Sequence, residues 1–113
     1  PGGKGGFDIY FTRRIGKYSW TAIQNLESAN SPFDELFPTL DFESNLYFSR
    51  PVEGRGLEIF VLPNGGRVPF ALPGPFNTIG DDFNLSVLDK RNIVLARVAS
   101  RNGDSDIFLY SLR

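Results

Sequence analysis

Three segments of the chain share nearly the same five-residue word, and their spacing limits the folds that the chain can adopt. The isoleucine at the centre of each word stands at position 9, 59 or 107, so successive words lie 50 and 48 residues apart. A period near fifty residues is typical of repeat architectures. The words are Phe7-Asp8-Ile9-Tyr10-Phe11, Leu57-Glu58-Ile59-Phe60-Val61 and Ser105-Asp106-Ile107-Phe108-Leu109.

Two further segments recur in step with these words. Residues 30–40 align with residues 77–87, and residues 45–50 align with residues 92–97, each at an offset of 47. The offset becomes 48 at the third word, which predicts a one-residue insertion in the loop 98–105. Three ordered matches make chance similarity a poor explanation, so the repeat guides the prediction of the fold.

The composition favours short strands. Of 113 residues, sixteen are aromatic, eleven of them Phe, and the chain also has 12 Gly and 8 Pro. Aromatic residues suit strands, whereas Gly and Pro suit turns, so we expect an all-β protein. The expected strands are 7–13, 36–40, 46–50, 57–62, 83–88, 92–98 and 106–112, with less regular strands at 18–26 and at 68–72, where Pro69 suits an edge position. Phe11, Phe37, Phe48, Phe60, Phe83 and Phe108 are expected in the core.

These strands predict repeats of a definite size. Each repeat is a four-stranded antiparallel meander of about 40 to 50 residues, the dimension of a β-propeller blade. In chain order, residues 1–29 supply the end of one blade and its outer strand, residues 30–72 a full blade and residues 73–113 a partial blade. Propellers generally need about four to eight blades. We therefore expect two to two and a half blades of a larger propeller, or copies that assemble into a ring.

Several functional classes are disfavoured. The net charge is −1 with no basic patch, so nucleic acid is not an expected partner. Apolar stretches fall well short of the ~20 residues of a membrane-spanning helix. The chain has no His or Cys, so it lacks a Ser-His-Asp or Cys-His arrangement, and we predict no catalytic, cofactor or metal residues. Because Pro1 is not an initiator Met, we expect a processed or internal piece of a longer chain.

Two acidic pairs and two aromatic residues are the candidate site residues. Asp34-Glu35 and Asp81-Asp82 recur at an offset of 47. They could hold Ca²⁺ or a cationic partner, or they could accept backbone N–H groups in Asx-type turns. Recurrence with the scaffold favours the structural interpretation. Tyr18 and Trp20 could either pack in the core or make surface contacts.

Several segments resemble a known family. The chain looks like TolB-type, WD-repeat-like β-propeller blades at residues 5–10, at Trp20 with Asn25-Leu26, in the segment 30–40 and in the strand 46–49. Its Gly-rich loop 1–6 is similar to that of the propellers in OmpA-family, peptidoglycan-associated outer-membrane lipoproteins. Val94-Leu95-Ala96-Arg97 departs from the family's aromatic run, and the family's OmpA domain is not within these residues.

The resemblance implies a non-enzymatic role. It predicts a periplasmic scaffold, associated with the outer membrane, that binds other envelope proteins, further copies of itself or further blades, without a cofactor. Two alternatives remain open. One is a glycan-binding, lectin-like propeller assembled from short chains, and the other is a fragment of a propeller hydrolase or lyase whose active site lies elsewhere.

Overall fold

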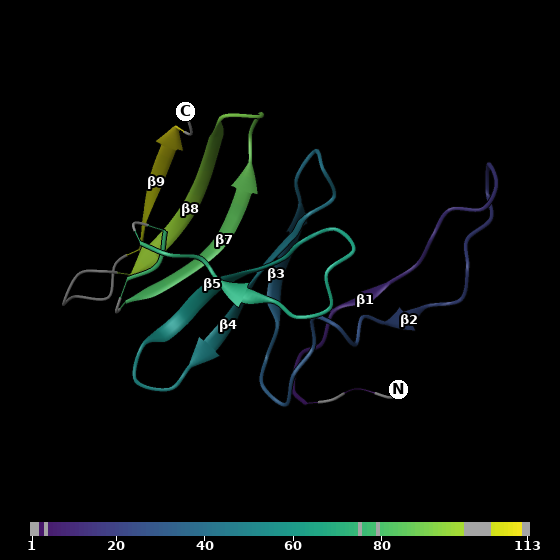
Figure 1. Cartoon of the computed structure of the whole chain (residues 1–113), viewed down its shortest axis with the longest axis horizontal. Coiled ribbons are helices and arrows are strands. Elements are labelled where there is room, and N and C mark those ends of the chain that lie inside the picture. The colour runs from purple at the N-terminus through teal and green to yellow at the C-terminus, as the bar shows by residue number, and fades with distance from the viewer. Residues whose placement is uncertain (1–2, 4, 75, 79, 99–104, 112–113) are drawn as a thin grey trace.

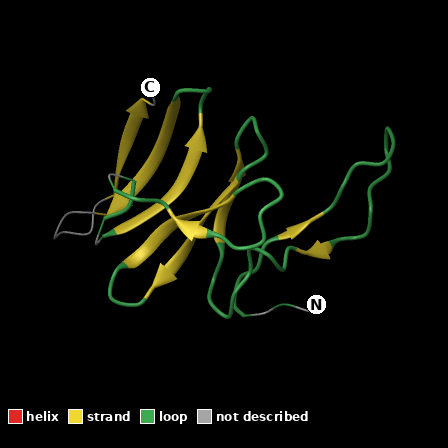
Figure 2. Ribbon diagram, in the orientation of Figure 1, coloured by secondary structure: helices red, strands yellow, loops and turns green. Residues whose placement is uncertain are grey.

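The structure, a computed structural model, describes residues 3, 5–74, 76–78, 80–98 and 105–111. This part of the chain forms strands and loops without a helix, which confirms the all-β prediction (Figure 2). Its strands make three antiparallel sheets of two, four and three strands. They are β1 (Tyr10–Phe11) and β2 (Gln24–Asn25) in the first sheet, β3 (Leu36–Leu40), β4 (Leu46–Val52), β5 (Gly56–Leu62) and β6 (Phe70–Ala71) in the second, and β7 (Asp81–Val87), β8 (Asn92–Val98) and β9 (Ser105–Ser111) in the third.

The sheets follow one another in chain order, and an apolar core fills each of the two junctions (Figure 1). The first core joins the β1–β2 segment to β3–β6 through Ile9, Ala29, Leu46, Phe48 and Leu62. The second joins β3–β6 to β7–β9 through Ile59, Leu85, Ile93 and Leu95. The β3–β6 sheet is therefore covered on both faces.

Alternation along β5 explains how one sheet contributes to both cores. Successive side chains of a strand point to opposite faces. Leu62 and Phe60 belong to the first core, whereas Ile59 belongs to the second. A strand that is covered on both faces has a nearly continuous run of apolar residues in its sequence, and the segment 57–62 has such a run.

The backbone repeats as closely as the sequence does. A register shift interrupts the β3–β4 pairing between Leu36 and Thr39, and another interrupts β7–β8 between Phe83 and Ser86. Within these irregularities Phe37 has φ 53° and Asn84 has φ 56°, both in the left-handed region. The two irregularities stand 47 residues apart, which is the offset of the sequence repeat.

The outer strands are shorter than expected. Of the segments 7–13, 18–26 and 68–72, strand pairing covers two residues each, in β1, β2 and β6. Residues 12–23 instead form an arm that projects from the body and is closed by an isolated bridge between Arg14 and Trp20 (Figure 1). The insertion predicted for the loop 98–105 falls largely at residues 99–104, outside the described residues.

The core prediction was wrong for one phenylalanine. Phe48 is 1% exposed, but Phe37 is 42% exposed. The left-handed backbone of Phe37 breaks the alternation of β3, so the ring meets Phe83 of the neighbouring sheet at a centroid distance of 5.6 Å instead of entering the core. Phe11, Phe60, Phe83 and Phe108 are partly buried.

Candidate functional site

A buried asparagine bridges the backbone at each junction between sheets. The Ile9 N–H donates to Asn30 Oδ1 at 2.7 Å, and Asn30 Nδ2 donates to the Ile9 carbonyl at 2.8 Å. Asn77 makes the same two bonds with Ile59, at 2.7 and 2.9 Å. Each amide thus satisfies both backbone groups of the isoleucine at the centre of the repeated word. We call this arrangement the asparagine clasp.

The first acidic residue of each pair reinforces the clasp. Asp34 Oδ1 accepts the Phe7 N–H at 2.7 Å, and Asp81 Oδ1 accepts the Leu57 N–H at 2.7 Å. In both cases the donor stands two residues before the clasped isoleucine. These two carboxylates therefore tie one sheet to the next at corresponding positions.

The second acidic residue of each pair is buried against an arginine. Glu35 is 2% exposed and accepts a bond from Arg50 Nε at 2.9 Å, while Asp82, 0% exposed, pairs with Arg97 Nε. Such pairs have most of their charge compensated inside the fold. Burial lowers the pKa of Arg97, but the bonds and charges of Asp82 and Tyr110 together outweigh burial and hold the pKa of Arg97 above its ordinary value.

Backbone donors complete the environment of these buried carboxylates. The Ser31 N–H donates to Glu35 Oε1 at 2.9 Å, and the Thr78 N–H donates to Asp82 Oδ2 at 2.6 Å. The hydroxyls of Ser31 and Thr78 donate to the same carboxylates at 2.5 and 2.9 Å. Among the described residues, no group of three or more acidic side chains is arranged to hold a metal ion.

The arginines also lie over aromatic rings. The Arg50 guanidinium carbon is 4.7 Å from the Phe60 ring centroid, and that of Arg97 is 4.6 Å from the Phe108 ring centroid. Stacking on a ring and pairing with a carboxylate are both suited to the planar guanidinium group. Each arginine therefore links its acidic partner to the strand that carries the repeated word.

A second acidic position, outside the candidate pairs, organises the hairpin turns. Asp41 Oδ1 accepts the N–H groups of Glu43 and Asn45 at 2.9 Å each. Burial favours the neutral acid, but bonds from Asn45, Glu43 and Tyr47 outweigh it and hold the pKa of Asp41 below its ordinary value. Burial, with the bond to Asp41, raises the pKa of Tyr47 to about 12. Asp89 plays the corresponding part in the β7–β8 turn.

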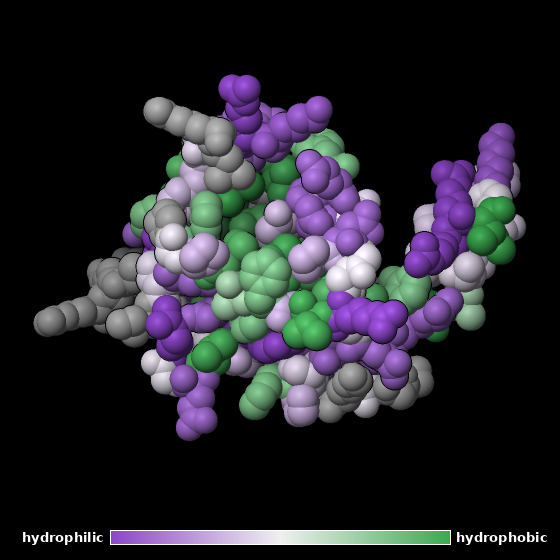
Figure 3. Space-filling view, in the orientation of Figure 1, coloured by the Kyte–Doolittle hydropathy of each residue, from purple (hydrophilic) through white to green (hydrophobic). Residues whose placement is uncertain are grey.

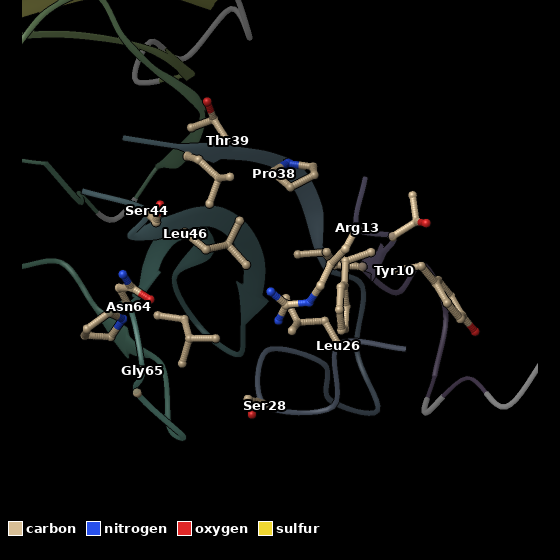
Figure 4. A pocket seen from close by; sticks show the side chains of 17 residues that line it. Tyr10, Arg13, Leu26, Ser28, Pro38, Thr39, Ser44, Leu46, Asn64 and Gly65 are labelled. Atoms are coloured by element: carbon tan, nitrogen blue, oxygen red, sulfur yellow. The ribbon is translucent and has the colours of Figure 1, made fainter. Parts of the chain in front are cut away.

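An open groove lies between the β1–β2 segment, where the arm begins, and the β3–β6 sheet. Its volume is about 700 Å³, within the range of ligand-binding clefts. Its walls are largely apolar, with Leu26, Leu46 and Leu62 among them, and Arg13 supplies the cationic group in its lining (Figure 4). The space-filling view shows the arm standing apart from the body beside this region (Figure 3).

The two candidate aromatic residues lie on the arm and are exposed. Tyr18 is 85% exposed and Trp20 is 57% exposed. Of the two alternatives, core packing and a surface position, the structure shows the surface position for both residues. The arm keeps its shape through its own bonds, since Arg14 donates to the carbonyls of Gly16 and Lys17 at 3.0 and 2.6 Å. Lys17 lies 5.5 Å from the Tyr18 ring centroid.

The sequence singles out the acidic pairs, but the asparagines of the clasp and the arginines of the ion pairs were missed. The signal that could have found them is the repeat itself. Asn77 follows Asn30 by 47 residues, and Arg97 follows Arg50 by the same interval. Arg13 in the groove had no such signal, because its place depends on the direction in which the arm leaves the body.

Comparison with family models, curated proteins and solved structures finds no significant match for the chain. Within the described residues, the structure has no helix of the length and apolar character needed to cross a membrane.

Proposed function

We propose that this chain is a non-catalytic binding and scaffolding module built from consecutive β-propeller blades. Its β3–β6 sheet serves as a full four-stranded blade, and β7–β9 serves as the next blade with three strands in place. The bulge, the asparagine of the clasp and the ion pair each recur at an offset of 47 residues, which supports this assignment.

One observation carries the functional part of the proposal. The acidic pairs are the most prominent polar feature of the sequence, and all four carboxylates are engaged inside the fold. The first residue of each pair bonds to the preceding sheet segment, and the second pairs with an arginine of its own sheet. A general acid or base needs a group that is available to a substrate. Glu35 and Asp82 are buried instead, so recognition falls to the groups that remain exposed.

The exposed groups suit a protein partner. The arm presents Tyr18 and Trp20, two residue types enriched at protein interfaces, and the groove beside it combines apolar walls with Arg13. The partner we propose is a protein segment with apolar and acidic side chains, bound by surface complementarity without a covalent step.

The resemblance to propellers of OmpA-family lipoproteins extends the proposal to a location. The module would work in the periplasm, associated with the outer membrane, and would hold other proteins of the envelope. Fractionation of cells that express the full gene product, followed by immunodetection, tests this part independently of binding.

Quantitative capture from a cell-envelope extract tests the binding role. The unmodified protein, the variant Tyr18→Ala/Trp20→Ala and the control Phe42→Ala/Leu88→Ala should be compared on the same resin. Phe42 and Leu88 are also exposed, at 68% and 56%, but lie on other loops. We expect the arm variant to lose about tenfold or more of a reproducible captured protein while the control retains it. Equal capture by both variants, or turnover of a polysaccharide or peptide by the purified protein, would contradict the proposal.

A second candidate function rests on the same aromatic pair. Exposed Tyr and Trp rings can stack on sugars, and the separation of the arm from the body leaves both rings accessible. Under this alternative, glycan fragments would shift the fluorescence of Trp20, the one tryptophan of the chain, and envelope proteins would not compete. Competition by protein and no response to glycans would favour the scaffold.

A further inference from the structure

One face of the β7–β9 sheet carries apolar side chains that, apart from Phe83 at its contact with Phe37, have no neighbouring sheet among the described residues. Cross-strand pairing aligns Phe83, Ala96 and Ile107 in one row and places Val94 beside Leu109 in the next. Ile107 is 81% exposed and Leu109 is 62% exposed. Exposed apolar side chains that adjoin one another on a sheet face can form an interaction surface, whereas isolated ones are ordinary.

The repeat shows what covers the same face elsewhere in the chain. In the β3–β6 sheet the corresponding row is Leu36, Ser49 and Ile59, and the β7–β9 sheet packs over it. There Ser49 is 1% exposed and Ile59 is 0% exposed. Ile59 and Ile107 are the central residues of successive repeated words, so the same position is buried in one sheet and open in the next.

Within the part of the chain that the structure describes, no strand pairs with the outer edge of β9. On the equivalent strand, β5, the edge is paired with β6, and the Leu72 N–H then donates to the Ile59 carbonyl at 2.9 Å. Asn77 follows and clasps Ile59 from a position 18 residues further along the chain. A unit that covers Ile107 in the same manner must therefore bring an edge strand, an asparagine and a carboxylate in that order.

We propose that the open face of β7–β9 docks a further repeat unit of this chain's own kind, joined in tandem. The unit adds an edge strand to β9, bridges the backbone of Ile107 with an asparagine, and covers Ile107 and Leu109 with apolar residues at the positions of Leu85, Ile93 and Leu95. This inference rests on the repeat contacts alone and stands whether or not the arm binds the proposed partner.

The test is a tandem extension that lets the chain supply the occupant. A copy of residues 66–113 is placed directly after Arg113, which keeps the 48-residue spacing and puts the copied Asn77 18 residues after Ile107. Amide hydrogen exchange at Ile107 is then compared in the original and extended proteins. We expect exchange to slow by about tenfold or more in the extended protein. The matched control is the same extension with the copied Asn77 and Asp81 both changed to Ala, in which the added protection should be lost.

A pair of substitutions keeps the proposal falsifiable if the extension folds poorly. Ile107→Asp should leave the melting temperature of the original chain nearly unchanged, because the side chain is exposed, whereas Ile59→Asp should lower it strongly. In the extended protein, Ile107→Asp should become as damaging as Ile59→Asp. Unchanged Ile107 exchange after extension would overturn the proposal. So would protection of Ile107 in the original chain that rises with protein concentration, since a second copy would then be the occupant.

Discussion

At the scale of single residues, each asparagine of the clasp bonds both backbone groups of one isoleucine, whereas the first acid of each pair accepts a single backbone N–H across the junction. An amide side chain has both a donor and an acceptor, so one Asn can satisfy the N–H and the carbonyl of the same isoleucine. Aspartate at that position could accept a bond but not donate one when ionised. The clasp therefore explains why the repeated segment begins with Asn30 in one copy and Asn77 in the other.

Replacing Asn77 with Ala should destabilise the fold. Asn77 is 8% exposed, bridges Ile59 and also donates to the Leu72 carbonyl at 2.7 Å. Losing these bonds removes the side-chain partner of the buried Ile59 N–H and of the Leu72 carbonyl, while the Ile59 carbonyl keeps its bond from the Leu72 N–H. We expect the free energy of unfolding to fall by about 3 kcal/mol. Urea unfolding monitored by circular dichroism measures this. Asn64→Ala, on an exposed loop, is the control, and an equal effect of both variants would argue against the clasp.

The Asp41 turn makes a pH-dependent contribution. Since the pKa of Asp41 in the folded state lies below 3.8, its ionised form stabilises the fold. That contribution is present above about pH 4 and is lost as the pH falls through the folded-state pKa. Asp41→Asn should therefore reduce the loss of stability between about pH 5 and pH 2. Thermal melts across this range test it, with Glu53→Gln on the exposed β4–β5 turn as control, and parallel curves for Asp41→Asn and the unmodified protein would contradict it.

At the scale of elements, the sequence predicts the central strands well and the outer ones poorly. Strands β4, β5, β7, β8 and β9 lie where alternation and turn residues indicate them. The segments 7–13 and 68–72 were also expected to be strands, but strand pairing within them is confined to Tyr10–Phe11 and Phe70–Ala71. Whether an edge segment pairs depends on its path relative to the neighbouring sheet, and local residue preference does not encode that path.

The bulges near the start of β3 and β7 were also not predicted from the sequence. Phe37 and Asn84 occupy the same left-handed backbone position, although their side chains differ in kind. Asn is often found in this conformation, whereas a Phe in the sequence gives no indication of left-handed backbone. The exposure of Phe37 therefore could not be predicted from an apolar pattern that assumes regular alternation.

A β-branched residue at Asn84 should be destabilising. Its φ of 56° is unfavourable for such side chains, and we expect Asn84→Val to lower the free energy of unfolding by about 1 to 2 kcal/mol. Asn84→Gly is the matched control, because glycine adopts this backbone conformation without steric cost. Chemical unfolding of the two variants measures the difference. Equal stability of the Val and Gly variants would mean that the bulge does not persist in solution.

At the scale of the whole molecule, the chain is a series of sheets joined by one recurring set of contacts. Each junction combines an apolar core with the bonds of an asparagine and an aspartate, and a buried acid–arginine pair lies beside it within the sheet that follows. The sequence period predicts the series and its order. It does not predict the junction chemistry, because the bonded groups lie 18 to 27 residues apart and belong to different sheets.

Amide hydrogen exchange at Ile9 and Ile59 tests this account most directly. Both N–H groups should be protected in the unmodified protein, because each donates to an asparagine side chain at 2.7 Å. Asn30→Ala should release the Ile9 amide and leave Ile59 protected, and Asn77→Ala should accelerate exchange at Ile59. If both amides exchange at the same rate in the variants as in the unmodified protein, the clasp does not join the sheets and the repeat-based description of the molecule is wrong.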